Sequence, residues 1–459
     1  MFTNLNSEIG EISQSIRWDD IQSESADLLR QLIRIDTTNP PGNENEAARL
    51  LKSFFDNEGI PSEIVESQKN RANVIADIPG REERTLILLS HTDVVPADPK
   101  KWSHKPFSGD ADKEYIWGRG AIDCKGFAAS GALVLALIKR LKIQLRNSIK
   151  FISTADEEMG GHFGAEYIVK NNINKNGKNY IGLINEGGIG VILGGKKLFL
   201  PCFGEKGPLW LKIIAKGKPG HASMPHNDNP NLILLDTLRK VCHMKPERRI
   251  VPNLAKSLET YIPTEIKNGS LLKIAIKGIF LLPNSHKILA EILDRILRKE
   301  KVKAMIKNTV CLTMIKSGYK ENVIPEEAEA TLDIRLLPGT SPYNFVEEIK
   351  KHLKDERIKV EIDKVYEPSE SDPNSEFLMK IRNLTKKLYP DIPFIPTLAT
   401  GFTDSRYFRA IGIQSYGFIP WFLTEEEIST IHGIDERISL QNLKEGIRTL
   451  FEIVTAIAM

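Results

Sequence analysis

Apolar positions in the first part of the chain follow two patterns that alternate along it. Apolar residues three and four positions apart indicate helices, and they predict helices over residues 19–35, 45–58 and 126–141. Short apolar or alternating runs indicate strands, and they predict strands over residues 62–66, 73–78, 85–90, 147–154 and 179–185. Such alternation is typical of an α/β domain with a mostly parallel sheet and helices on both faces.

A different pattern begins near Gly204. Strands are predicted over residues 209–216, 309–317, 329–336 and 359–366, and helices over residues 230–243 and 343–353. Their order, strand–helix–strand–strand–helix–strand, is that of a ferredoxin-like α+β unit. The α/β pattern resumes near residue 372, with predicted helices over residues 374–388 and 440–456. Ser439 is placed to cap the second of these helices.

The length of 459 residues is too great for one ordinary core. We therefore predict an α/β domain built from residues 1–203 and 368–459, into which a second domain, residues 204–367, is inserted. The inserted domain contains an extra segment at about residues 245–307, which includes a basic amphipathic helix over residues 286–307. Such a helix is more often a solvated surface than a site for a partner or a membrane surface, and both explanations stay open.

The composition, 41% hydrophobic and 27% charged residues with a net charge of +3, is that of a soluble globular protein and gives no indication of nucleic acid binding. The cysteines are far apart and form no CxxC pair, which argues against a disulfide scaffold and favours a reducing compartment; they are Cys124, Cys202, Cys242 and Cys311. The N-terminus is polar, and the longest apolar run is shorter than the roughly 20 residues of a membrane span. We expect a cytoplasmic protein without a signal peptide or a membrane span.

Functional side chains follow the predicted strand over residues 85–90. His91 and Asp93 come directly after it, and side chains two positions apart in an extended chain point the same way. A histidine with a carboxylate beside it is typical of a metal ligand and the group that orients it. Asp123 follows in a loop, residues 118–123, whose glycines permit unusual backbone geometry.

More candidate ligands follow other predicted strands. Glu157 and Glu158 come after one strand, Glu186 after the next, and His432 lies in a late loop. With His91 and Asp123 these residues supply two imidazoles and four carboxylates. Nitrogen and oxygen donors without a thiolate favour a catalytic zinc, cobalt or manganese site with an open position. The number of donors exceeds the need of one ion, so we predict a dinuclear site with a bridging carboxylate.

Neighbouring Glu157 and Glu158 are expected to diverge at the strand end, so that one binds metal while the other faces the substrate as a free base. Metal lowers the pKa of a water molecule, and the free carboxylate could accept and redeliver its proton. Taken alone, such a pair is more often a solvated acidic turn. Its position beside the histidines favours the functional explanation.

The sequence resembles a known family, the dinuclear zinc amidohydrolases and metallopeptidases that include aminoacylase, succinyl-diaminopimelate desuccinylase, acetylornithine deacetylase, carboxypeptidase S and glutamate carboxypeptidase. No single motif is specific, but the ordered set is, and it covers nearly the whole chain. The motifs are HTDVVP (91–96), GRGAIDCKG (118–126), ADEEMGG (155–161), NEGG (185–188), GKPGHAS (217–223), ENVIPEEAEATLDIRLLPG (321–339), GFTDSR (401–406) and IHGIDE (431–436).

The resemblance implies a zinc-exopeptidase-like catalytic domain, with the inserted domain as its lid, and two divalent metal ions. Zinc is the expected metal, and cobalt and manganese are the alternatives. Asp123 would bridge both ions, with His91 and Glu186 completing one ion and Glu158 and His432 the other.

The resemblance also assigns catalytic roles. Glu157 would be the general base and acid, and Asp93 would orient His91. His221, in the lid, would stabilise the tetrahedral oxyanion, and in family dimers this histidine can come from the partner subunit.

Substrate-binding roles follow in the same way. Asn322 and Arg335 would hold the substrate, Arg335 through a bidentate contact with its terminal carboxylate. Gly401 and Thr403 would line the same pocket. Alternatives stay open, because Arg335 could instead pair with Asp333, and Asn322 could cap a turn.

The sequence departs from the family pattern at three positions, Cys124, Phe402 and Asn185. We expect Cys124 to pack rather than to bind metal, and Phe402 to reshape the carboxylate pocket. The extra segment resembles the longer lid of the carboxypeptidase S-like branch and leaves a homodimer through the lid open.

The expected activity is metal-dependent hydrolysis of the amide bond of N-acyl amino acids or small peptides that carry a free carboxylate. A dipeptidase or carboxypeptidase is the first alternative, because the sequence does not define the acyl pocket. A non-catalytic binding protein and a dinuclear phosphoesterase are weaker alternatives, since the ligands, the base and the carboxylate-binding motifs are all present.

Overall fold

The computed structural model describes residues 2–173, 179–245, 247–254, 285–296 and 300–459, and these fold into two compact units. The first unit comprises residues 1–203, 371–397 and 403–459, and the second comprises residues 204–370 and 398–402. Much of the extra segment lies outside the described residues. Where the basic helix was predicted, the described residues form α9 (Ser285–Ile296) and α10 (Glu300–Ala304).

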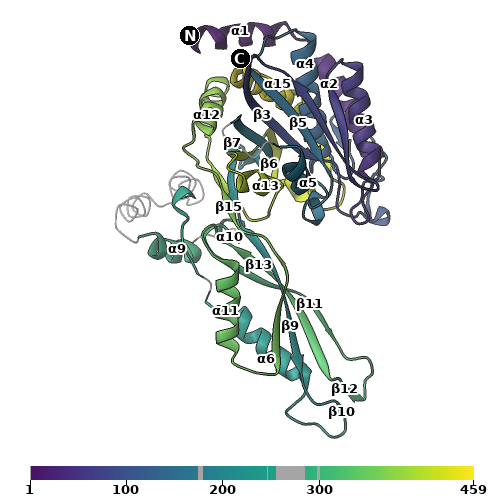
Figure 1. Ribbon diagram of the computed structural model, residues 1–459, viewed down its shortest axis with the longest axis vertical. Helices are drawn as coiled ribbons and strands as arrows, with labels where there is room; N and C mark the ends of the chain where they lie inside the picture. Colours follow the sequence, from purple (N-terminus) through teal and green to yellow (C-terminus); the bar gives the residue numbers. More distant parts are fainter. Residues whose placement is uncertain (1, 174–178, 246, 255–284, 297–299) are drawn as a thin grey trace. The chain divides into compact units, whose positions relative to one another are not determined.

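The first unit is built on a mostly parallel sheet (Figure 1), which confirms the predicted fold class. Its strands lie in the order β1 (Ser62–Gln68), β2 (Arg71–Ile78), β5 (Asn147–Thr154), β3 (Glu82–His91), β6 (Tyr180–Leu193) and β17 (Ser415–Thr424). Neighbours from β5 to β17 are parallel, while β1 and β2 are antiparallel. The carboxyl ends of the parallel strands therefore share one edge of the sheet.

Helices cover both faces of this sheet. Ile87 and Leu89 of β3 pack with residues of α5 (Ala165–Asn171) and α13 (Ser405–Ala410). On the opposite face α4 (Lys125–Arg140) packs against β3 and β5, and α15 (Leu440–Ala458) packs on α4 and β17. The predicted cap of α15 is confirmed, because the Ser439 side chain accepts a hydrogen bond from the Asn442 amide. The remaining helices of this unit are α1 (Phe2–Ser15), α2 (Trp18–Arg34), α3 (Glu44–Asn57), α12 (Glu376–Leu388) and α14 (Glu425–Thr430).

Strand β17 was not predicted, although it is buried over most of its length beside β6. It contains Gly417 and Pro420, which are uncommon in a central strand and obscured the pattern. Its Trp421 packs on α15 at Gly446, where a side-chain Cβ would lie 2.2 Å from the indole ring. Only glycine leaves room for that ring, so the helix and the strand are matched in shape at this point.

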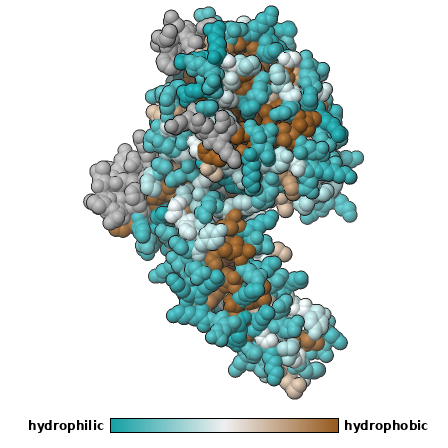
Figure 2. Space-filling model, viewed as in Figure 1, coloured by the Kyte–Doolittle hydropathy of each residue, from teal (hydrophilic) through white to brown (hydrophobic). Residues whose placement is uncertain are grey.

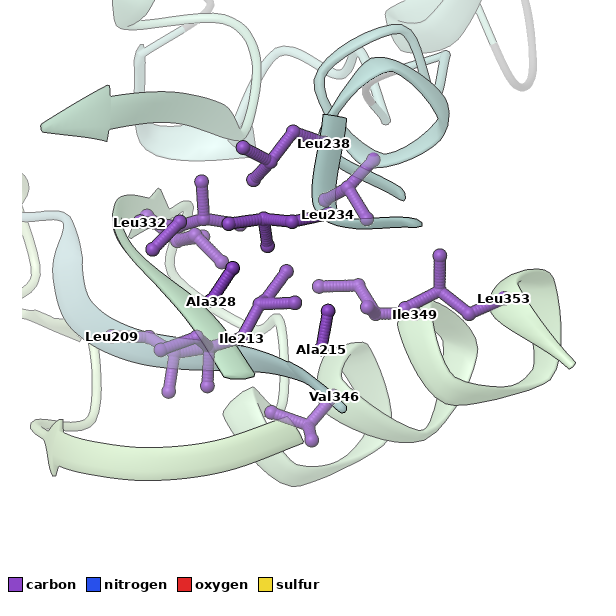
Figure 3. Close-up of a cluster of buried hydrophobic side chains, with 14 of the residues drawn as sticks. Leu209, Ile213, Ala215, Leu234, Leu238, Ala328, Leu332, Val346, Ile349 and Leu353 are labelled. Carbon is purple, nitrogen blue, oxygen red and sulfur yellow. The ribbon is translucent and has the colours of Figure 1, made fainter. Parts of the chain in front are cut away.

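The second unit has the predicted ferredoxin-like order. Its sheet runs β11 (Thr309–Ser317), β13 (Glu327–Leu336), β9 (Gly207–Lys216) and β14 (Ile358–Val365), with all neighbours antiparallel. Helices α6 (Pro230–Cys242) and α11 (Pro342–Leu353) supply apolar side chains that form one core with the sheet, including Leu332 and Leu234 (Figure 3).

Short elements complete the described chain. They are β4 (Tyr115–Trp117), β7 (Lys196–Leu200), β8 (Cys202–Glu205), β10 (Gly220–His221), β12 (Val323–Ile324), β15 (Ser369–Glu370), β16 (Thr397–Ala399), β18 (Arg437–Ser439) and the 3-10 turns η1 (Pro99–Lys101) and η2 (Glu157–Met159). Among the described helices, none combines the length and the apolar character that crossing a membrane requires.

The core of the second unit gives a stability prediction. Leu332 is fully buried, so Leu332→Ala should lower the free energy of unfolding by about 2–5 kcal/mol. Ile288→Ala is the control, because Ile288 is 61% exposed and its truncation should change stability by less than about 0.5 kcal/mol. Urea unfolding measures both, and equal losses would contradict the assignment of Leu332 to the core.

Candidate metal centre

His91 stands at the carboxyl edge of the parallel sheet. It ends β3 and pairs in register with Thr154, which ends β5. The ring is buried, with Nε2 3.0 Å from Asp123 Oδ1 and 3.5 Å from Glu186 Oε1. Nδ1 lies 3.0 Å from the Asp93 carbonyl oxygen, a contact that fixes the orientation of the ring.

Glu186 reaches this edge from inside a strand. The sequence placed it after a strand ending at residue 185, and this boundary was wrong, because β6 continues to Leu193. The register between β6 and β17 shifts just beyond Asn185, which pairs with Gly417. Such an irregularity re-aims a side chain within a strand, and Glu186 is thereby part of the cluster around His91.

A second group of ligand atoms lies on the other side of Asp123. His432 Nε2 is 3.0 Å from Asp123 Oδ2 and 3.2 Å from Glu158 Oε1. Asp123 therefore presents one carboxylate oxygen to each histidine. This is the arrangement expected of a carboxylate that bridges two ions.

The donor set fits divalent cations. Ligands bonded to zinc at about 2.1 Å in a tetrahedron lie about 3.4 Å from one another, and the separations around His91 and His432 are 3.0–3.5 Å. Cys124 Sγ also lies within 4.8 Å of ligand atoms of His91 and Glu186. Burial raises the pKa of the Cys124 thiol well above its usual value, which disfavours the thiolate that binds metal.

The cluster concentrates negative charge in a buried place. Burial, followed by the charge of Asp123, raises the pKa of Glu186 to about 8. Burial and the charge of Glu186 raise the pKa of Glu157 well above its usual range. Hydrogen bonds to Asp123 and Glu158 raise the pKa of His432 to about 10. Divalent cations would relieve this repulsion, so the electrostatics agree with the donor set.

Asp93 joins the His91 strand to the turn that carries Glu157 and Glu158. Its Oδ1 accepts a hydrogen bond from the Glu157 amide (3.0 Å) and its Oδ2 accepts one from the Glu158 amide (3.1 Å). Asn39 Nδ2 donates to the same Oδ2 at 2.8 Å. Burial alone would raise the pKa of Asp93, but its contact with His91 lowers it, so this carboxylate keeps its charge.

Sequence reasoning missed a buried ion pair behind this turn. Arg71 forms two 2.8 Å hydrogen bonds with the Glu44 carboxylate and a third with Asp156, which precedes Glu157. Asp156 has a positive φ of 68°, so the turn is held in a backbone conformation that few residues adopt. Neither Arg71 nor Glu44 lies in a motif or at a periodic position that could have revealed this role.

Four predicted site residues, His221, Asn322, Arg335 and Gly401, belong to the second unit. His221 lies in β10, and the Ala222 amide donates to the Asn322 carbonyl oxygen at 3.0 Å, so His221 and Asn322 are neighbours. Both are exposed.

Arg335 points its guanidinium at Asp333, with Nε 2.6 Å from Oδ1 and Nη2 2.9 Å from Oδ2. Its guanidinium also lies 5.5 Å from the Phe402 ring centroid. The bidentate contact that the sequence assigned to a substrate carboxylate is thus made with Asp333 in this structure. Thr403 belongs to the first unit, where its Oγ1 accepts a hydrogen bond from the Ser405 amide.

Comparison with known proteins agrees with this geometry. The sequence profile of peptidase family M20/M25/M40 matches residues 87–456. The N-fatty-acyl-amino acid synthase/hydrolase PM20D1 of Xenopus tropicalis is 30% identical over 382 residues, which are 80% of this chain and 70% of that protein. The probable carboxypeptidase S-like 2 of Dictyostelium discoideum is 29% identical over 391 residues, or 81% and 71% of the two chains.

The fold has solved counterparts. The M20 family metallo-carboxypeptidase Sso-CP2 from Sulfolobus solfataricus superposes with a TM-score of 0.73 at 22% identity, covering 94% of this chain and 98% of that one. At that identity the likeness concerns the fold.

Asp93 generates a testable prediction. Asp93→Asn replaces an acceptor oxygen with an NH₂ group that faces backbone amides, and should weaken metal binding about 10–100-fold. Calorimetric titration of Zn²⁺ into the metal-free protein measures the effect. Asp77→Asn is the control, because Asp77 pairs with Lys150 on the same sheet, away from the ligands. Wild-type affinity in Asp93→Asn would refute the role of this carboxylate.

Proposed function

The chain belongs to peptidase family M20/M25/M40, and from this membership we propose that it hydrolyses the amide bond of N-acyl amino acids or small peptides bearing a free carboxylate. The observation that carries the proposal is Asp123, which presents one oxygen to His91 and the other to His432. A family member that had lost catalysis would be expected to lack one of the metal ligands or the base. This chain has every candidate ligand and the candidate base.

We propose two divalent cations, with Zn²⁺ as the native metal and Co²⁺ or Mn²⁺ as alternatives that the same donors accept. His91 and Glu186 would hold one, His432 and Glu158 the other, and Asp123 both. Bound there, the cations would supply a water molecule of lowered pKa and polarise the scissile carbonyl.

Glu157 is the proposed general base. It is not one of the proposed metal ligands, its side chain is buried beside the cluster, and its backbone amide donates a hydrogen bond to Asp93. It would take a proton from the attacking water and return it to the leaving nitrogen. His221 would donate a hydrogen bond to the oxyanion, from its own chain or from a partner subunit.

The substrate's carboxylate is assigned to Asn322, Arg335, Gly401 and Thr403. Nε and one N–H of Nη2 of Arg335 contact Asp333, so Nη1 and the second N–H of Nη2 remain for a substrate. Asp333 would then orient the guanidinium, and the Nη1–Nη2 edge would make the bidentate contact expected from the sequence.

The substrate branch is a choice between N-acyl amino acids and peptides. The names of the relatives include both an N-fatty-acyl-amino acid synthase/hydrolase and a carboxypeptidase S-like protein. We favour N-acyl amino acids, with a dipeptidase or carboxypeptidase as the alternative.

A mixed panel of N-acyl amino acids and dipeptides tests the proposal by release of free amine. The metal-loaded protein should act on one class, and Glu157→Gln should lower turnover about 10²–10⁴-fold while it keeps its metals. Metal content per chain is measured on both proteins. Wild-type turnover in Glu157→Gln with bound metal would remove Glu157 from the mechanism, and inactivity of a metal-loaded wild type on every substrate would refute the amide specificity.

We also propose a homodimer through the second unit. Strand β11 is at an edge of its sheet and, among the described strands, pairs with β13 alone. Exposed apolar side chains lie on β11, just after it and on neighbouring α6. These are Leu232, Leu235, Leu312, Met314, Ile315 and Tyr319. Figure 2 shows apolar surface on this unit. An unpaired edge with apolar side chains favours pairing with a second copy of itself.

The dimer is tested at Met314, which is 65% exposed on the free edge. Met314→Lys should shift the sedimentation coefficient from that of a dimer to that of a monomer, because a charge would be buried between the strands. Met379→Lys, on α12 of the first unit, is the matched control. A monomeric wild type, or a Met314→Lys protein that stays dimeric, would contradict this interface.

A cytoplasmic location stays a prediction from the sequence.

A further inference from the structure

A buried ion pair, Arg119–Glu436, lies directly behind the ligands Asp123 and His432. Glu436 is completely buried and Arg119 is 2% exposed. Each lies four positions from a ligand in the sequence, Arg119 before Asp123 and Glu436 after His432.

The Glu436 carboxylate binds the backbone of the loop that carries Asp123. Its Oε1 accepts hydrogen bonds from the amides of Ile122 (2.8 Å) and Asp123 (3.1 Å), and its Oε2 accepts one from Gly120 (3.1 Å). A single carboxylate therefore fixes successive backbone groups up to the ligand itself.

Arg119 makes the reciprocal contact. Its Nη1 donates to Glu436 Oε2 at 2.7 Å, and its Nη2 donates to the carbonyl oxygen of Gly433, the residue after His432, at 2.8 Å. The guanidinium lies 5.1 Å from the Trp102 ring centroid, which limits its movement. The loop of each ligand is thus held by a side chain from the loop of the other.

Backbone pairing continues the connection. The Gly118 amide donates to the Glu436 carbonyl oxygen at 2.8 Å, and β4 pairs with β18 from Trp117 and Arg437 onward. These contacts join the chain before Asp123 to the chain after His432 without involving a ligand atom.

We propose that the Arg119–Glu436 pair positions Asp123 and His432 for the second cation, so that this half of the centre is formed before metal binds. The inference rests on the metal centre of the proposed function. His91 and Glu186 are held by β3 and β6, whereas His432 lies in a loop with a positive φ of 58° and depends on contacts with its neighbours.

The charge and the geometry of the Arg119–Glu436 pair favour a role in positioning the ligand loops over a role in stabilising the fold. A buried ion pair adds little net stability, because the cost of desolvating its charges offsets their attraction. Groups that orient metal ligands typically change metal affinity about 10–100-fold when they are removed.

Glu436→Gln tests the proposal, because glutamine keeps the size but replaces one acceptor oxygen with an NH₂ group. Zn²⁺ is titrated calorimetrically into the metal-free proteins. The wild type should bind two ions, and Glu436→Gln should bind the ion of His432 and Glu158 at least about tenfold more weakly, with a smaller loss at the other ion, which shares Asp123.

Glu452→Gln is the matched control. Glu452 is also buried and paired with an arginine, accepting hydrogen bonds from Arg448 (3.2 Å) and Ser13 (2.6 Å), but it lies in α15. This variant should bind both ions as the wild type does, whatever its stability. Equal weakening in Glu452→Gln and Glu436→Gln would assign the effect to general destabilisation and overturn the proposal.

A second variant, Arg119→Lys, keeps the charge but cannot reach both Glu436 and Gly433, and should weaken the same ion. It decides the question if Glu436→Gln fails to fold, as judged by circular dichroism. Wild-type affinity for both ions in a folded variant would overturn the positioning role alone. A wild type that binds no ion would instead overturn the proposed metal centre.

Discussion

The first unit gathers carboxylates at a place from which water is largely excluded. The repulsion between their negative charges is the constraint that the surrounding residues must offset. Parallel strands deliver Asp93, Glu157, Glu158 and Glu186 to one edge of the sheet, and Asp123 joins them from the loop before α4. Burial opposes the charge of each. Backbone amides and histidine nitrogens offset part of the cost of burying these charges. Basic side chains such as Arg71 lie behind the cluster rather than within it. The space between the carboxylates is thereby left to cations from outside.

This arrangement divides the centre into residues held by the sheet and residues held by neighbouring side chains. His91 ends a central strand, and its position follows from the sheet itself. Glu157, Glu158 and His432 lie on turns that are held by side chains such as Asp93 and Arg119. The second unit is built differently. Its core consists of apolar side chains, and its candidate functional residues lie at the surface. The candidate metal ligands and the candidate base thus lie in the first unit, whereas His221 and most of the candidate substrate-binding residues lie in the second.

Much of this organisation could be predicted from the sequence, and the failures have physical causes. Periodicity identified most long elements, because an element with one buried face has apolar and polar residues in a regular pattern along its sequence. The central strand β17 escaped because both of its faces are buried and it contains Gly417 and Pro420. The candidate ligands could be named from the sequence because they follow strands or motifs. The pair that we propose to position them could not, since Arg119 and Glu436 are 317 residues apart and their pairing exists only in the folded chain.

The order of the ligands along the chain has a consequence for synthesis. His91, Asp123, Glu158 and Glu186 all precede the second unit, whereas His432, Glu436 and the long helix α15 follow it. A nascent chain therefore carries most of its acidic cluster through the synthesis of an entire intervening unit before the last histidine arrives. During that interval α4 also lacks α15, one of the helices that pack on it. The final stretch of the polypeptide closes the core and completes the cluster together, so that assembly of the centre is tied to completion of the fold.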